Sequence, residues 1–395
     1  MISMENADIA ALQKKIDDLN ATLNRQHAEH LGWLNQLLQQ EVQIVSAQGG
    51  GVKQELQSLK RALGITDANM PFEPYYNRGV ELTSRQPEIY NKYGERLHVV
   101  FFSDREGAHC GCGNMGRYLY TDRYNYGLKN HFYTHDEIFR TVGKPDNRFA
   151  MLNESRSIRP QSYTNVLNNK SYVQNEFKYV FTFDADVLNS LSNARLLINA
   201  GYWYGAYKPT MGREKEAVSN VVVSVDNYKN KNKNISIIAS NKQMCKGHRL
   251  RQAFARKCKA EHLADTFGRF DGGEYCPIEL PFQHYRYSIA IENDVTPYYW
   301  TEKINNCFAS MTIPVYLGAS EIGKFFNPDG IITLKESDLD NLDEVLKQCT
   351  PQEYERRLPA VIDNYNRLMY YNDGNSGIDL LYKQFLRPFF EPQKS

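Results

Sequence analysis

The sequence predicts an α/β protein built from two Rossmann-like domains with a helical extension in front of them. Three observations lead to this fold class. Short apolar and β-branched runs alternate with longer segments that suit helices or loops, which is the pattern of parallel sheets with crossover connections. A polar stretch, residues 205–234, divides these runs into two groups. Residues 5–46 instead repeat apolar side chains at helical spacing.

Length and charge set the limits of this prediction. A chain of 395 residues suits two domains plus an extension. The 47 basic and 46 acidic residues nearly cancel, so the sequence predicts no nucleic-acid partner and leaves an anion to be met by a few placed cations. The 27 Tyr and 19 Phe either stack on sugars or fill the two cores.

The N-terminal segment, 1–65, is predicted to form coiled-coil helices. Ile9, Leu12, Ile16, Leu19 and Leu23 alternate three and four residues apart, as in a coiled-coil seam. We therefore expect a homo-oligomer, and a single amphipathic helix packed on its own catalytic domain is the alternative. The three glycines at 49–51 end or bend the helix.

The chain has no apolar run of transmembrane length, and its first residues lack the order of a signal peptide. The predicted location is the cytoplasm, including the inner face of the membrane as a peripheral site. Seven scattered cysteines agree with a reducing compartment. Because Cys110-Gly111-Cys112 has no second cysteine pair at zinc-like spacing, a turn is expected there rather than a metal site.

The elements follow from local composition. The first domain is assigned to 72–228 and the second to 235–360, with C-terminal helices over 361–395. The stretch 227–234 is too polar for a core element, and a helix is expected over 353–371. Strands are predicted at 98–102, 148–152 and 179–183, then at 235–239, 264–267, 287–291, 313–317 and 330–334.

The segment 285–317 contains a strand, a polar loop, a helix and a second strand. Its first strand ends at Glu292-Asn293, and in open α/β sheets ligands bind beyond such carboxyl ends. Thr301 is expected to cap the helix, whose first turn carries Glu302 and Lys303. Helix dipole and Lys303 together favour an anion such as a nucleotide diphosphate.

The same segment resembles the α-1,3/1,4-fucosyltransferases, whose signature combines an E-N strand end, Y-x-T-E-K and V-P-V-x-x-G. The likeness covers roughly residues 148–334, in the order of the family. The matching residues are Glu292-Asn293, Tyr299–Lys303 and Ile313–Gly318, preceded by Met151–Ser155, Tyr179–Asp184, Ser240-Asn241, Leu250–Phe254 and Asp265–Arg269.

The resemblance implies a GT-B fold, in which an acceptor-binding and a GDP-sugar-binding Rossmann-like domain face one cleft and the C-terminal helices cross back to the first domain. It implies an inverting transfer of L-fucose from GDP-fucose to a hydroxyl of an acceptor glycan, a glycolipid included. The expected linkage is α-1,3 on an oligosaccharide or cell-surface polysaccharide that contains N-acetylglucosamine or glucose. No metal or other cofactor is expected.

Five residues match the donor-binding positions of the family. The resemblance gives Arg251 and Lys303 to the diphosphate, Asn293 and Tyr299 to the diphosphate-sugar linkage, and Glu302 to the ribose hydroxyls. Arg249 is a rival for the part of Arg251, and a solvated helix pair is the alternative for Glu302 and Lys303.

Glu154 matches the general base of the family. It follows a buried strand, where partial burial would raise the pKa of its carboxyl toward the working pH. Arg156 stands where the family commonly has proline, so a structural Glu154–Arg156 pair is the alternative. Asp184 and Asp186 have the spacing that holds a metal ion in GT-A transferases, but Asp186 is also placed to cap a helix that begins near Val187.

Two other functions stay open. The donor could carry another GDP-linked 6-deoxyhexose, or the chain could be a coiled-coil scaffold with an inactive transferase-like domain. Deletion of 1–65 separates the scaffold from an enzyme, since an enzyme keeps residual transfer in a smaller oligomer. The sequence contains no Walker A loop, no G-x-G-x-x-G after a strand and no H-E-x-x-H helix, so kinases, dehydrogenases and metalloproteases are not favoured.

Overall fold

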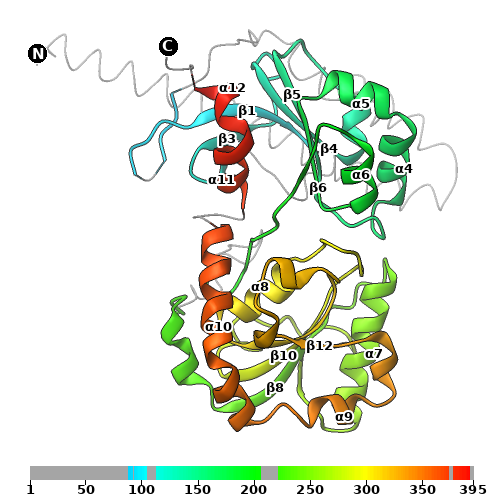
Figure 1. The fold of residues 1–395 in the computed structure, drawn as a ribbon, viewed down its shortest axis with the longest axis vertical. Helices are drawn as coiled ribbons and strands as arrows, with labels where there is room; N and C mark the ends of the chain where they lie inside the picture. The colour runs from blue at the N-terminus through cyan, green and yellow to red at the C-terminus, as the bar shows by residue number, and fades with distance from the viewer. Residues whose placement is uncertain (1–87, 92, 105–112, 206–220, 373–376, 392–395) are drawn as a thin grey trace, which may run out of the picture. The chain divides into compact units, whose positions relative to one another are not determined.

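The computed structural model describes residues 88–91, 93–104, 113–205, 221–372 and 377–391. The predicted coiled coil at 1–65 and the Cys110-Gly111-Cys112 segment lie outside these ranges. Residues 83–395 form one compact unit, which contains two β-sheets with helices packed against them (Figure 1). Nearly all strand pairs are parallel, so the predicted α/β class is confirmed.

The first sheet has seven strands in the order β2-β3-β1-β4-β5-β6-β7. Only β2 pairs antiparallel, with β3. The central register sets Phe132 of β4 between Phe102 and Phe149. The strands are β1 (His98–Ser103), β2 (Gly113–Met115), β3 (Leu119–Asp122), β4 (Asn130–Thr134), β5 (Asn147–Leu152), β6 (Tyr179–Thr182) and β7 (Ala194–Leu196).

The sequence predicted β1, β5 and β6 of this sheet but not the four others. The strand β4, Asn-His-Phe-Tyr-Thr, is buried along its whole length although three of its residues are polar. His131 bonds to the Tyr133 hydroxyl at 2.7 Å, and Asn130 accepts a bond from Asn147 at 2.8 Å. Because these partners come from the tertiary structure, composition alone does not mark β4 as a core strand.

The second sheet has five parallel strands in the order β12-β11-β10-β8-β9. Every strand predicted for this part of the chain is present. Tyr287 of the central strand lies between Ile313 and Ile235 in the register. The strands are β8 (Lys233–Ile238), β9 (Asp265–Phe267), β10 (Tyr285–Ile291), β11 (Ile313–Leu317) and β12 (Ile332–Thr333).

The stretch 227–234 was predicted to be too polar for a core element, and Lys231 is the one residue in it that is buried. A 3₁₀ helix, η2 (Val225–Asn230), enters this stretch, and β8 begins at Lys233. Lys231 is buried, and its Nζ donates to the Phe282 carbonyl at 2.7 Å and to Thr312 Oγ1 at 2.8 Å. Burial lowers the pKa of Lys231 well below its ordinary value. Within this polar sequence, Lys231 is therefore a buried residue that joins the segment before β8 to Phe282 and Thr312 by hydrogen bonds.

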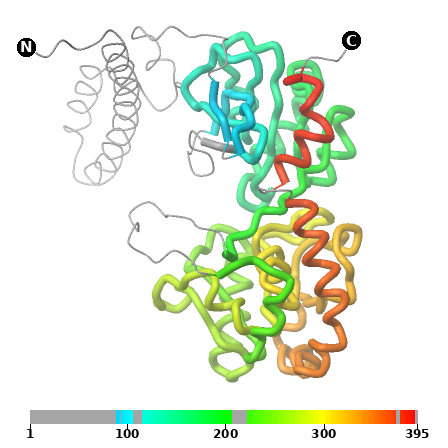
Figure 2. The backbone as a smooth tube through the Cα atoms, turned by 90° about the vertical axis from the view of Figure 1, so that its left-hand side faces the viewer, coloured from blue at the N-terminus to red at the C-terminus, as the bar shows by residue number. Residues whose placement is uncertain are grey.

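Helices cover both sheets. The long helix α10 agrees with the helix predicted at 353–371. After it, α11 and α12 pack on the first sheet, as Figure 2 shows in red, and the rings of Phe389 and Phe149 lie 5.3 Å apart. The helices are α4 (Pro160–Asn168), α5 (Lys170–Glu176), α6 (Ala185–Ser190), α7 (Lys246–Ala260), α8 (Glu302–Ala309), α9 (Leu342–Leu346), α10 (Pro351–Asn372), α11 (Ile378–Leu381) and α12 (Arg387–Phe390).

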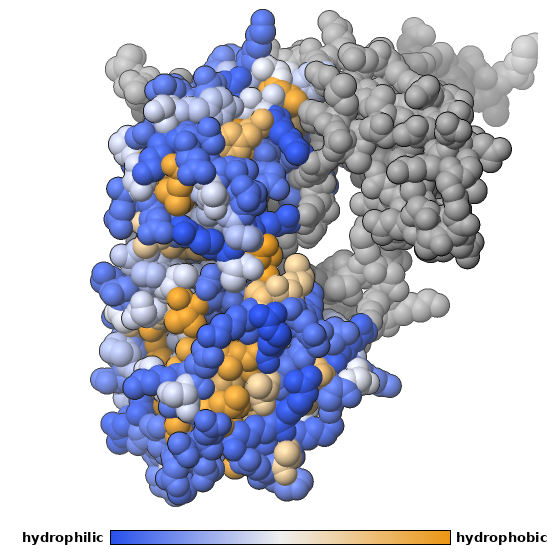
Figure 3. Space-filling view, turned by 90° about the vertical axis from the view of Figure 1, so that its right-hand side faces the viewer, coloured by the Kyte–Doolittle hydropathy of each residue, from blue (hydrophilic) through white to orange (hydrophobic). Residues whose placement is uncertain are grey.

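Apolar side chains fill both faces of each sheet. The largest buried side chains are aromatic, among them Trp300, Tyr133, Phe101 and Phe132. Aromatic residues therefore serve the cores to a large extent, while the face drawn in Figure 3 is mostly hydrophilic with apolar residues between. Across the described part of the chain, no helix combines the length and the apolar character that crossing a membrane requires.

Candidate functional site

The start of α8 is fixed to the end of β10 by Glu292. This carboxylate is buried and follows directly after the strand. Its Oε1 accepts the Thr301 backbone N–H at 2.8 Å, and its Oε2 accepts the Thr301 hydroxyl at 2.7 Å. Thr301 holds the predicted N-cap position, but its side chain makes no cap bond to the helix. The free N–H groups of the first turn are thus held at the carboxyl edge of the second sheet.

Lys303 lies between two carboxylates in the first turn of α8. Its Nζ is 2.9 Å from Glu302 Oε1 and 3.4 Å from Glu292 Oε2. Burial by itself would lower the pKa of Lys303, but the two carboxylates raise it above its ordinary value. Burial by itself would raise the pKa of Glu302. The charge and hydrogen bond of Lys303 outweigh this effect, so the pKa of Glu302 lies below its ordinary value. With side chains only 17% and 22% exposed, Lys303 and Glu302 are not the solvated pair of the alternative.

Arg251 reaches the same edge from α7. Its Nε donates to the Ile291 carbonyl at 2.7 Å, and its Nη2 donates to Asn293 Oδ1 at 2.9 Å. The rival Arg249 is exposed and bonds to the Gln243 carbonyl at 3.1 Å. The helix periodicity therefore directs Arg251, and not Arg249, toward the end of β10. The charge of Arg251 is buried beside the predicted anion site.

Two glycines allow the close packing of this edge. A Cβ on Gly247, in the first turn of α7, would lie 2.5 Å from the Asn293 carbonyl oxygen. A Cβ on Gly318, just after β11, would lie 2.6 Å from Glu292 Cγ. Any larger residue at Gly247 would push α7 away from the backbone at 292–293, and one at Gly318 would collide with the side chains of Tyr316 and Glu292. The presence of a glycine at 318, the last position of the V-P-V-x-x-G signature, thus has a steric explanation.

Tyr299 connects the two halves of the predicted site. It is buried, and its ring lies 4.7 Å from that of Phe183, which follows the first-sheet strand β6. Burial raises its pKa well above the ordinary value, and the charges of Glu292, Glu154 and Glu302 raise it further. Glu154 therefore lies near enough to act electrostatically on Tyr299, and the phenol keeps its proton at neutral pH.

Glu154 follows β5 in a loop held from several sides. Its backbone N–H donates to His135 Nε2 at 3.0 Å, and its carbonyl accepts the Tyr163 hydroxyl. Nearby, Ser157 Oγ donates to the Asn293 carbonyl at 3.2 Å, which links this loop to the 292–293 loop. The backbone at Glu154 is thus fixed while its carboxylate is partly exposed.

Arg156 binds the two aspartates of the possible metal motif. Its Nε and Nη2 lie 2.9 and 2.6 Å from the carboxylate of Asp184, and its Nη1 lies 3.0 Å from Asp186. Asp184 also caps α6 by accepting the Val187 N–H at 3.0 Å. The prediction that Asp186 is the cap was wrong, since the cap is two residues earlier. Among the described residues, no group of three His, Cys, Asp or Glu is arranged to hold a metal ion.

His135, which accepts the backbone N–H of Glu154, is a residue that the sequence did not single out. It begins the 3₁₀ helix η1 (His135–Phe139), is 8% exposed, and has a positive φ of 46°. Burial and the charge of Arg159 lower its pKa to about 4. A buried, non-glycine residue with positive φ beside a predicted base is an uncommon feature. No signal marked it, because the strand β4 before it was not predicted.

The structure thus brings Arg251, Asn293, Glu302 and Lys303 to one edge of the second sheet, through direct contacts or the shared partner Glu292. Tyr299 lies beside them, and Glu154 approaches from the first sheet. Glu292 had no predicted role, although its position directly after β10 was a signal for one.

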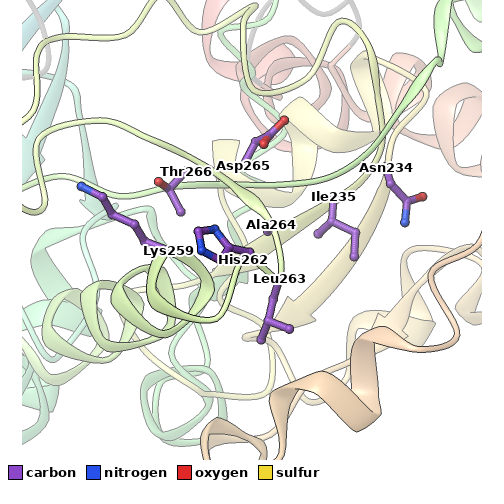
Figure 4. Close-up of a pocket in the computed structure, with 8 residues that line it drawn as sticks. All are labelled: Asn234, Ile235, Lys259, His262, Leu263, Ala264, Asp265 and Thr266. Carbon is purple, nitrogen blue, oxygen red and sulfur yellow. The ribbon is translucent and has the colours of Figure 1, made fainter.

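A pocket elsewhere on the second sheet is separate from this cluster. Figure 4 shows it at the start of β8 and β9, around Asn234, Ile235, Lys259, His262 and Asp265. These are the amino ends of parallel strands, and Ile291, Glu292 and Asn293 mark the opposite edge. The pocket and the charged cluster are therefore different places on the second sheet.

Two largely parallel sheets define an open α/β fold, in which ligands bind beyond the carboxyl ends of the strands. Residues 228–356 match the family model of the glycosyltransferase family 10 (fucosyltransferase) C-term. An α-(1,4)-fucosyltransferase of Arabidopsis thaliana is 33% identical over 76 residues, or 19% of this chain and 18% of that protein. The chain thus matches less than a fifth of this curated relative. The predicted resemblance to fucosyltransferases is confirmed.

Solved structures of low identity are also similar. An α1,3-fucosyltransferase with GDP-fucose shows 16% identity and a TM-score of 0.42, over 76% of this chain and 91% of that chain. Anabaena Alr3699/HepE with UDP and glucose shows 9% identity and a TM-score of 0.43, over 74% and 98%.

Proposed function

We propose that this protein is an inverting fucosyltransferase of GT-B type, which transfers L-fucose from GDP-fucose to a hydroxyl of an acceptor glycan. One observation carries the proposal. The segment that matches the fucosyltransferase family model, 228–356, contains a cluster of buried Arg251 with partly buried Glu302 and Lys303 at the carboxyl edge of its sheet. Fixed cations and a helix N-terminus are one of the two usual ways to stabilise a departing diphosphate.

The donor residues act on the leaving group. Arg251 and Lys303 offset the negative charge that develops on the diphosphate, and the free N–H groups of α8 point the same way. Asn293 is oriented by its bond from Arg251, with its amide left for the diphosphate-sugar linkage. Glu302 accepts hydrogen bonds from the ribose hydroxyls, which separates it from Lys303 and frees the ammonium for phosphate.

Glu154 acts as the general base. Its carboxylate takes the proton of the acceptor hydroxyl while the oxygen bonds to the anomeric carbon and the bond from that carbon to the diphosphate breaks. The β-linked donor then gives an α-linked product in one displacement. The protonated Tyr299, between Glu154 and the donor cluster, donates a hydrogen bond to the departing oxygen. The preferred acceptor contains N-acetylglucosamine or glucose, with an α-1,3 linkage.

Transfer of labelled fucose tests the proposal directly. The full chain is incubated with radiolabelled GDP-fucose and a panel of acceptors that contain galactose, glucose or N-acetylglucosamine, with GDP-rhamnose as the competing 6-deoxyhexose donor. We expect label in at least one acceptor and release of GDP in equal amount. Transfer from GDP-rhamnose and not from GDP-fucose would show that the donor is a different GDP-linked 6-deoxyhexose. No transfer together with no GDP binding would favour the scaffold function.

A further inference from the structure

His248 is a buried side chain at the donor edge that the mechanism above does not use. It is the third residue of α7 and only 6% exposed, yet its Nδ1 has no hydrogen-bond partner among the described residues. Buried polar atoms almost always have partners, and the exceptions call for a cause such as a missing ligand. The two neighbouring site residues of the helix, Gly247 and Arg251, already contact the 292–293 loop.

The surroundings of His248 are cationic. Burial first, and then the charges of Arg251, Lys303, Lys242 and Arg249, lower the pKa of its imidazole to about 4. The ring is therefore neutral at pH 7 and carries one N–H donor. The 15-residue helix α7 begins two residues earlier, so its free N–H groups add positive potential at the same place. These positively charged groups together favour the binding of an anionic ligand.

The packing of α7 holds the imidazole in place. Gly247, the residue before it, lies so close to the Asn293 carbonyl that no side chain fits between them. Cys245, at the N-cap, donates from its Sγ to the same carbonyl at 3.5 Å. The first turn of α7 is therefore docked on the loop that follows β10, and a residue of this turn is positioned for whatever that loop binds.

We propose that His248 is a further binding residue for the donor, and that its Nδ1–H donates a hydrogen bond to an oxygen of the GDP diphosphate. This inference rests on the proposed function and adds a fourth protein group to the diphosphate contacts of Arg251, Lys303 and the α8 N-terminus. Because the diphosphate offsets the four cations that lower its pKa, His248 takes up a proton more readily when the donor is bound. Donor binding below neutral pH is then accompanied by proton uptake.

Calorimetric titration of the full chain tests the contact. His248→Phe keeps the ring volume but removes the donor, and should weaken GDP binding about tenfold or more, since a hydrogen bond to a charged group has that effect. Binding of guanosine, which has no phosphate, should stay within twofold. His248→Asn returns an N–H near the Nδ1 position and should recover most of the GDP affinity. His262→Phe, at an exposed histidine beyond the other end of α7, is the matched control and should bind GDP as the wild type does.

Protons are counted by titrating GDP-fucose into the wild type at pH 6 in two buffers of different ionisation enthalpy. Its diphosphate has no oxygen that titrates near this pH, so uptake that disappears in His248→Phe belongs to the imidazole. Unchanged GDP affinity in His248→Phe overturns the inference, and so does an equal loss for GDP and guanosine, which would mark a structural ring. A wild type that binds neither GDP nor GDP-fucose overturns the proposed function and this contact with it. The first two results overturn the contact alone.

Discussion

The carboxyl edge of the second sheet around Asn293 and Lys303, here called the donor edge, differs from the loop after β5 that carries Glu154, here called the base loop. The two are built in different ways. Glu292, Asn293, Tyr299, Glu302 and Lys303 come from one continuous segment, and Arg251 joins them from α7. The loop that carries Glu154 is held by Tyr163 of α4 and by two residues that are more distant in the sequence, His135 at the start of η1 and Asp184 at the cap of α6. The site residues of one continuous segment can be predicted from their spacing in the sequence. A loop whose position depends on contacts from other segments cannot be predicted in this way. The two regions should also respond differently to substitution.

The largest effect is expected at the base loop, in turnover. Glu154→Gln removes the basic oxygen and keeps the shape of the side chain, so kcat should fall by a factor of about 10² to 10⁴. GDP affinity should change by less than about twofold, because the donor edge is complete without this residue. Radiolabel transfer and calorimetry measure the two quantities, and Glu176→Gln, at the exposed end of α5, is the control. Retained turnover would point to another base.

The next effect is expected at the donor edge, in binding. Arg251→Lys loses one of the two bonds to Ile291 and Asn293, because an ammonium cannot reproduce the guanidinium fork. GDP affinity should fall about tenfold or more, consistent with ~1.5 kcal/mol for one bond to a charged group. Arg249→Lys, on the exposed side of α7, should have little effect. An equal loss of GDP affinity in the two variants would contradict the assignment of Arg251, and not Arg249, to the diphosphate.

Glu302→Ala tests the same edge at the ribose. Removing the carboxylate should weaken binding of GDP by about tenfold, but weaken 2′,3′-dideoxy-GDP much less, since one or two hydrogen bonds of ~1 kcal/mol are at stake. Calorimetry with both nucleotides measures the difference. Unchanged GDP affinity would contradict the ribose role and leave Glu302 as a partner of Lys303 alone.

Stability should show the structural part of Glu292. Glu292→Gln places an amide where the carboxylate accepts from Thr301 and faces Lys303, so one buried bond is lost. The free energy of unfolding should fall by about 2 kcal/mol, measured by denaturant titration. Glu344→Gln, an exposed glutamate on α9, serves as the control. A loss as small as that of the control would contradict the assignment of Glu292 as the residue that ties α8 to β10.

Acid should weaken the first sheet through its buried histidines. Burial lowers the pKa of His131 and of His135 to about 4, below the ordinary 6.5. Between these values the unfolded chain binds more protons than the folded chain, so stability falls as the pH drops from 6.5 toward 4. His135→Gln should make this decline shallower, by on the order of 1 to 3 kcal/mol at pH 4. Thermal unfolding across the pH range measures it, and an unaltered slope would contradict the burial argument.

The smallest effect is expected from removal of metal ions. Asp184 already caps α6 and binds Arg156, which also contacts Asp186. Initial rates in EDTA should therefore stay within about twofold of those in Mn²⁺, because fixed cations stabilise the leaving group. A strict requirement for Mn²⁺ would restore the metal interpretation of the two aspartates.

The strands of the second sheet were all predicted, and four of seven in the first were not. The reason is visible in β10 and β4. The strand β10 is apolar and β-branched near its end, so its burial follows from its composition. The strand β4 contains Asn130, His131 and Thr134, which are buried because other segments supply their hydrogen-bond partners. Lys231 in the polar stretch was missed for the same reason.

The sequence alone determined the α/β class, the strand–loop–helix–strand of 285–317 and the charged residues at its junctions, because spacing within one segment carries that information. Only the tertiary structure showed that Arg251 and not Arg249 reaches the end of β10, and that Arg156 binds Asp184 and Asp186. It also showed that His135 accepts the backbone N–H of Glu154 and that His248 is buried. Each of these choices depends on which distant backbone lies within hydrogen-bond reach. Close packing at Gly247 and burial decide that distance, and neither is local to the residues concerned.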